Sequence, residues 1–151
     1  GRQVALVVLG FDSLLGSIGE SFVHSVRANP GKPMSEIAWS EKLPVTGVPY
    51  VDRVATKPIE IGGRQIKENQ RVRLYLDAFG QAGPAHHDLY FGAGRHACLG
   101  RPIAQKAWQA LTLNLATIRR RVAIVNVGYR SSDSVFNCPT SLMVRVDGPN
   151  R

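Results

Sequence analysis

The spacing of apolar residues predicts two long helices in this chain of 151 residues, at about 4–28 and about 101–119. In the second stretch, apolar residues recur three or four positions apart, which is the period of an α-helix. They are Ala104, Trp108, Leu111, Leu115 and Ile118. A shorter helix is expected at about 33–42. Strands are expected between about 51 and 76, and again after 122. The predicted fold class is mixed α/β, of the α+β kind and mainly helical, in a single domain over 1–151.

The segment F-G-A-G-R-H-A-C-L-G, Phe91 to Gly100, carries the most specific chemical pattern in the chain. Gly92 and Gly94 permit backbone conformations that a β-carbon would forbid. Pro102 fits the first turn of the helix that follows, so Cys98 lies at or just before the positive end of that helix. Backbone amides there favour a thiolate, the form of cysteine that binds metals. The alternative is that this cysteine is simply a small buried apolar residue, which is the commoner case.

This decapeptide resembles the cysteine-ligand loop of the cytochrome P450 family, whose pattern is F-x-x-G-x-H/R-x-C-x-G. The fixed positions of that pattern are met by Phe91, Gly94, His96, Cys98 and Gly100. The resemblance implies haem b (iron protoporphyrin IX) as the cofactor and Cys98 as the axial ligand of its iron. The residues that it places at the cofactor are Arg53, Phe91, Gly92, Gly94, His96, Cys98, Gly100 and Ala104.

The resemblance extends to the first predicted helix. The stretch Val7 to Leu15 looks like the centre of the family's distal helix, with Gly10 at the glycine that widens the helix over the haem. Asp12 and Ser13 then fall on the acid–alcohol pair that delivers protons to the distal side, and are the predicted catalytic residues. The alternative is a polar interruption of a buried helix, because such side chains often bond only to nearby backbone.

Two further segments resemble hairpins of the same family. Tyr50 to Ile66 is similar to the region that carries an arginine for a haem propionate, here Arg53, with His96 as a second propionate contact. Tyr129 to Val146 is similar to the closing hairpin, whose tip at Asn137 to Ser141 enters the substrate pocket. The resemblance therefore covers nearly the whole chain.

Several features depart from the family pattern. The family's N-terminal half and its meander are missing, so we expect a fragment, a split gene product or a reduced form. Glu36 begins the E-x-x-R motif, but Trp39 stands at the arginine position, and residues 76–90 replace the meander that completes the same ion-pair network. Loss of a whole buried ionic network can be neutral, so the paired loss indicates relaxation of one substructure. Gln105 and Ala107 stand where the family usually has an arginine and a glutamate.

The charge balance bears on the partners. There are 19 Lys and Arg against 11 Asp and Glu, which gives a net charge of +8 and a pI of about 10.1. Around and after the cysteine loop lie Arg95, Arg101, Lys106 and Arg119 to Arg121. The resemblance implies that this face receives an acidic ferredoxin or flavoprotein as electron donor, although a solvated basic face is an equally simple reading. We expect no nucleic-acid partner, because no nucleic-acid motif accompanies the basic residues.

The remaining features concern compartment and assembly. Cys98 and Cys138 do not suggest a disulfide framework, and a reducing, cytoplasmic location would keep a thiol available. No membrane span is expected, and apolar surface left by the missing half could be covered by a complementary chain or by self-association. His86 and His87 are interpreted as loop residues rather than metal ligands.

Two functions follow from these observations. The first is a haem-thiolate oxidoreductase, of monooxygenase or peroxygenase type, that acts on a small organic substrate. Asp12 and Ser13 together with the cysteine loop favour it. The second is a non-catalytic or degenerate haem-binding fragment that needs a partner chain, which the broken E-x-x-R motif and the missing meander favour.

Overall fold

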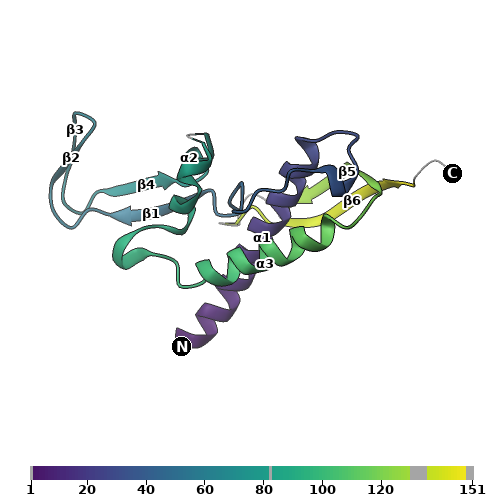
Figure 1. The fold of residues 1–151 in the computed structure, drawn as a ribbon. Coiled ribbons are helices and arrows are strands. Elements are labelled where there is room, and N and C mark those ends of the chain that lie inside the picture. The colour runs from purple at the N-terminus through teal and green to yellow at the C-terminus, as the bar shows by residue number, and fades with distance from the viewer. Residues whose placement is uncertain (1, 82, 130–135, 149–151) are drawn as a thin grey trace.

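A computed structural model of the chain describes residues 2–81, 83–129 and 136–148 (Figure 1). Two α-helices, α1 (Arg2–Arg27) and α3 (Arg101–Leu115), cross each other, and a short helix α2 covers Ala78–Gln81. Three 3₁₀ helices are η1 (Met34–Glu36), η2 (Pro84–Phe91) and η3 (Gly94–His96). This mixture of helices and small sheets confirms the predicted α+β class.

The described strands form three two-stranded antiparallel sheets. They are β1 (Tyr50–Val54) with β4 (Arg71–Tyr75), β2 (Ile59–Ile61) with β3 (Arg64–Ile66), and β5 (Arg121–Tyr129) with β6 (Pro139–Asp147). Figure 1 shows the first two sheets extending away from the long helices, whereas β5 and β6 lie beside α1. The β5–β6 hairpin begins at Arg121, which confirms the strands expected after 122 to within two residues, and it starts earlier than Tyr129, where the resemblance to the closing hairpin begins.

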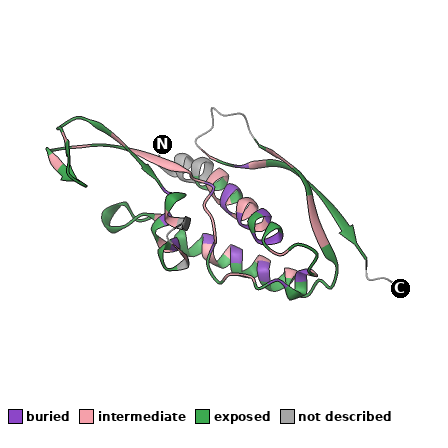
Figure 2. Cartoon of the chain, turned by 90° about the horizontal axis from the view of Figure 1, so that it is seen from above, coloured by how far each residue is buried: buried purple, intermediate pink, exposed green. Residues whose placement is uncertain are grey.

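The core lies between the two long helices. Trp108 of α3 is fully buried and packs with Leu43 and Ala104 against Leu14 and Ile18 of α1. Figure 2 shows the buried residues gathered on these two helices, while the β1–β4 hairpin is mostly exposed or half-buried. Burial of large apolar side chains is the main favourable term in folding, so we expect the α1–α3 contact to contribute most to the stability of the chain.

The segment before β6 is fixed against the middle of α1. The Asn137 amide donates to the Gly47 carbonyl at 2.8 Å, and the Gly47 amide donates to the Ser17 hydroxyl at 3.0 Å. A β-carbon on Gly47 would lie 2.4 Å from the carbonyl carbon of Gly16, so only glycine permits this close crossing. Asn137, the first residue of the segment predicted to reach the substrate pocket, is thereby held against α1. Residues 130–135 of the predicted closing hairpin lie outside the described residues.

The predicted helix at 33–42 is wrong beyond its first turn, since only Met34–Glu36 are helical and the backbone at Ile37 is extended. The reason is a local hydrogen bond: the Trp39 indole N–H donates to the Met34 carbonyl at 3.0 Å, which turns the chain back on itself. The long helices were predicted to within a few residues, although α3 ends at Leu115 rather than at 119.

Candidate functional site

The cysteine loop connects η2 to α3 and is shaped by two glycines in the left-handed region. Gly92 has φ of 70° and Gly94 has φ of 58°. A β-carbon on Gly92 would lie only 2.9 Å from the His96 carbonyl oxygen, whereas one on Gly94 would meet nothing within 4 Å. The Cys98 amide donates to the Phe91 carbonyl at 2.7 Å and closes the loop. The conformation predicted from the glycine spacing is confirmed.

The side chain of Cys98 is exposed, and it lies two residues before the N-cap of α3, which is Gly100. Pro102 occupies the first turn of that helix, as predicted. The Arg101 amide donates to the Cys98 carbonyl at 3.3 Å, so the cysteine backbone is tied to the first residue of the helix. The interpretation of this residue as a buried apolar cysteine is therefore wrong. That interpretation fits Cys138 instead, which is buried with only 9% of its surface exposed.

The other residues that the resemblance places at the cofactor fall into two groups. Gly94 and His96 share the exposed loop with Cys98. Phe91 is half-buried and packs on the core cluster, and Ala104 is itself a buried member of that cluster. Residues at both ends of the loop thus pack in the core, while His96 and Cys98 within the loop are exposed.

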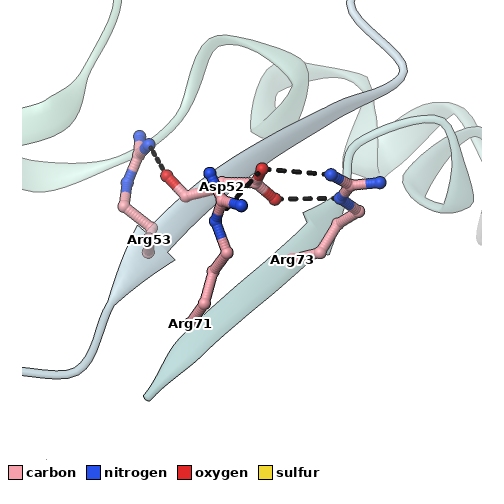
Figure 3. A network of polar contacts seen from close by, with 4 residues as sticks. All are labelled: Asp52, Arg53, Arg71 and Arg73. Carbon is pink, nitrogen blue, oxygen red and sulfur yellow. Dashed lines mark hydrogen bonds and ion pairs between the residues drawn. The ribbon is translucent and has the colours of Figure 1, made fainter. Parts of the chain in front are cut away.

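Arg53 lies on a different element from the loop, on the exposed strand β1 opposite Val72. Its guanidinium donates to the Asp52 carbonyl at 2.8 Å (Figure 3). The Asp52 carboxylate instead binds Arg73, at 2.9 and 3.1 Å, with Arg71 at 3.7 Å. The hydrogen bonds from Arg73 hold the pKa of Asp52 below its usual value. Asp52 therefore organises the hairpin, and the Arg53 side chain stays outside that carboxylate network.

Asp12 and Ser13 are half-buried in α1, directly before Leu14, the first of the α1 residues that pack on the Trp108 cluster. The Ser13 hydroxyl donates to the Gly10 carbonyl at 3.1 Å, a bond within the helix that matches the local alternative. Gly10 itself is exposed, and a β-carbon there would meet nothing within 4 Å. The helix thus borders open space at Gly10, one turn before the residues that pack on the Trp108 cluster.

An aromatic cluster occupies the place where an arginine was expected. Trp39 stacks on Phe22, with ring centroids 6.3 Å apart, and meets the edge of Trp108 at 6.0 Å. The Trp108 indole N–H donates to the Ser40 carbonyl at 2.9 Å. The missing arginine was evident from the sequence, but the aromatic cluster of Phe22, Trp39 and Trp108 was not predicted. A signal was present in the sequence: of the chain's 2 tryptophans, Trp39 stands at the arginine position itself and Trp108 lies on the apolar face of the helix predicted at 101–119.

The segment in place of the meander is docked by contacts that sequence reasoning also missed. Asp88 of η2 accepts from Lys42 at 2.7 Å, and the Tyr90 hydroxyl donates to the Pro44 carbonyl at 3.1 Å. His87 is buried and stacks on Tyr90 with centroids 5.3 Å apart. Burial, followed by the charge of Lys42, lowers the pKa of His87. This histidine is thus a packing residue of η2.

Two absences among the described residues bear on the class of site. No group of three or more His, Cys, Asp or Glu side chains that could hold a metal ion occurs among them. No helix in the described part of the chain is long and apolar enough to cross a membrane.

Comparison with known proteins places the fold. No protein-family model matches the chain, and no curated protein matches it in sequence. Among solved structures, cytochrome P450 CREJ superposes with a TM-score of 0.70 and 24% identity, covering 97% of this chain and 42% of its own.

Two further structures agree. The cytochrome P450 enzyme CYP109B1 from Bacillus subtilis gives a TM-score of 0.67 and 22% identity, with 94% of this chain and 44% of its own covered. A thermophilic cytochrome P450 from Sulfolobus tokodaii gives 0.62 and 25%, with 89% and 41% covered. The chain thus spans 41–44% of the length of these three structures. Over that span it has the fold of the C-terminal part of the cytochrome P450 family.

Proposed function

We propose that this chain is the haem-thiolate part of an oxidoreductase of monooxygenase or peroxygenase type, with Cys98 as the axial ligand of a haem b iron. One observation carries the proposal: a closed, glycine-shaped loop presents an exposed thiol at the start of α3, within a cytochrome P450 fold. A thiolate is a soft ligand suited to iron, and the start of a helix favours its charge.

The residues around Cys98 fit a large, mostly apolar cofactor with acidic edges. Leu99 directly follows Cys98 and Ile103 lies in the first turn of α3; they are 82% and 66% exposed, which is unusual for large apolar side chains unless a ligand or partner covers them. Arg95 and His96 supply exposed basic groups on the same loop. Arg53 is proposed as the second propionate contact, reached from β1. Haem, when bound, supplies the activation of oxygen or peroxide and the transfer of an oxygen atom to an organic substrate.

The chain's own residues have distinct roles in this proposal. Cys98 gives up its proton and supplies the thiolate. Ser13 and Asp12 handle protons on the distal side, since a hydroxyl can rotate from the Gly10 carbonyl toward a bound water and a neighbouring carboxylate can relay a proton from solvent. The substrate is proposed to be a small organic molecule.

We further propose that an electron-donor protein with an acidic surface binds the side of the chain that carries the cysteine loop. Arg95, Arg101 and Lys106 are exposed there. A net charge of +8 steers acidic partners toward the chain at low ionic strength. A ferredoxin or flavoprotein is the proposed partner class.

A second candidate is a haem-binding chain that needs a complementary chain and does no chemistry alone. It is favoured by the exposed apolar face of α1, where Phe11 and Leu15 are 60% and 44% exposed. In this case the thiolate site is retained, but the substrate pocket is completed only by a second polypeptide.

The absorption spectrum of the protein loaded with haem tests both candidates. We expect the reduced, carbon-monoxide-bound protein to show the red-shifted Soret band of thiolate-ligated haem, and Cys98→Ala to abolish it while Cys138→Ala keeps it. An unchanged band in Cys98→Ala would refute the assignment. Product formation from a small organic substrate and peroxide would support the enzyme, whereas the band without turnover would support the second candidate.

A further inference from the structure

Building on the proposed function, we infer that Asp88 is a positioning residue for Cys98: its carboxylate joins the two ends of the cysteine loop and fixes them to the rest of the chain. Asp88 lies on η2, directly before the loop. Arg101 is the first residue of α3, directly after it. The Arg101 Nη2 atom lies 2.9 Å from Asp88 Oδ1, so one ion pair bridges the loop from end to end.

The second oxygen of the same carboxylate reaches a distant segment. Lys42 Nζ lies 2.7 Å from Asp88 Oδ2 and precedes Asp88 by 46 residues. Lys42 follows the turn at Trp39 and sits beside Leu43, a buried member of the core cluster. The carboxylate thus connects the loop ends to the packed core through one cation on each oxygen.

The path from Asp88 to the thiol is short. The Arg101 guanidinium pairs with Asp88, and the Arg101 backbone amide donates to the Cys98 carbonyl at 3.3 Å. Inside the loop, the Cys98 amide donates to Phe91, three residues after Asp88 on the same 3₁₀ helix. The backbone of Cys98 is therefore held by two hydrogen bonds whose other partners both belong to elements that Asp88 fixes.

The three paired side chains are partly exposed, which indicates that they fix the position of the loop more than they stabilise the whole chain. The Asp88, Lys42 and Arg101 side chains are 33%, 46% and 45% exposed. Ion pairs at such exposure add little to global stability. A 3₁₀ helix, however, is a weak element by itself and depends on outside contacts for its place. The hydrogen bond from Lys42 also lowers the pKa of Asp88, so the carboxylate is charged at neutral pH.

The described residues also hold an ionic link near the position where the family's network was expected. Where an arginine was expected, Trp39 packs among aromatic rings and cannot link segments by charge. The ionic link instead runs through Lys42, Asp88 and Arg101. Packing and charge pairing are thus divided between two neighbouring sets of residues.

Asp88→Asn tests the inference, with Asp88→Glu as the conservative variant and Asp147→Asn as the matched control. Asp147 also pairs with an arginine, Arg145, at 3.4 Å, but at the far end of β6. Amide hydrogen exchange is measured on haem-free protein and the carbon-monoxide spectrum on protein loaded with haem. In Asp88→Asn we expect exchange at 91–98 to rise about three- to fivefold, the size of an exposed ion pair, with α1 and β5–β6 unchanged.

In the haem-loaded protein, the same variant should lower the ratio of thiolate-type to thiol-type carbon-monoxide complex by a similar factor, and Asp88→Glu should restore part of it. Equal loop exchange in Asp88→Asn and wild type would overturn the inference, as would an equal rise in Asp147→Asn or a rise spread over the whole chain. Should wild type show no thiolate band, the proposed function fails, and loop exchange alone decides whether Asp88 positions Cys98. Arg101→Gln should raise loop exchange as Asp88→Asn does, and unchanged loop exchange in it would also count against the inference.

Discussion

The cysteine loop and the polar stretch of α1 would face the same cofactor, but they are built in different ways. The loop is fixed by its own backbone: a bond of 2.7 Å from Cys98 to Phe91 and a Gly92 that no other residue could replace without moving His96. In α1, the Ser13 hydroxyl donates to the Gly10 carbonyl of its own helix, and the neighbouring Phe11 is 60% exposed. The proposed ligand side is thus held by short-range contacts within its own loop, whereas the proposed distal side lies beside an exposed apolar side chain of α1.

The largest expected effect is a loss of stability when the core between α1 and α3 is disrupted. Trp108→Ala should lower the free energy of unfolding by about 3–5 kcal/mol, because a fully buried indole leaves a cavity between α1 and α3. Small domains have only about 5–15 kcal/mol in total, so urea denaturation should show a clearly lower midpoint. Leu113→Ala, on the same helix but 72% exposed, is the control and should change stability little. Equal losses in both variants would show that the α1–α3 contact is not the main core.

The next effect tests the loop alone. Gly92→Ala combines a φ of 70° with a 2.9 Å approach to the His96 carbonyl, and should cost about 1–3 kcal/mol. Gly94→Ala shares the positive φ but has open space around its β-carbon, and should cost about 1 kcal/mol. The difference between the two variants measures the contact that shapes the loop. Haem affinity should fall with Gly92→Ala, and identical behaviour of the two variants would contradict the described geometry.

These residues also show what sequence could and could not predict. The loop was predictable, because its glycines, cysteine and following proline act within about ten residues of one another. The aromatic cluster joins Phe22, Trp39 and Trp108 from three separate segments, and a pattern along the chain does not show which residues meet. The helix expected at 33–42 does not form for a related reason: the Trp39 indole N–H bonds back to the Met34 carbonyl, and the β-branched Ile37 between them takes an extended backbone.

A smaller effect concerns the proposed propionate contacts, which come from two separate elements. Arg53→Ala and His96→Ala should each raise the rate of haem transfer to an apo-acceptor by roughly tenfold, since charge-assisted hydrogen bonds contribute about 1.5–3 kcal/mol. Arg71→Ala is the matched control on the same hairpin, because Arg71 pairs weakly with Asp52 at 3.7 Å and is 76% exposed. Transfer at the wild-type rate in both test variants would remove them from the site, and a loss in Arg53→Ala alone would leave the hairpin as the only anchor.

The smallest structural effect, and the sharpest test of the distal side, is expected from Ser13→Ala. Its hydroxyl donates only within α1, so the substitution should leave folding and haem binding nearly intact. If Ser13 holds a water for proton delivery, the variant should divert reducing equivalents to peroxide at the expense of product. Product and peroxide are measured together with an electron donor present, and Asp12→Asn is examined in parallel. If Ser13→Ala still converts all reducing equivalents into product, the serine is only a local polar interruption of the helix. In that case the cysteine loop would carry a chemical role, whereas Ser13 would not.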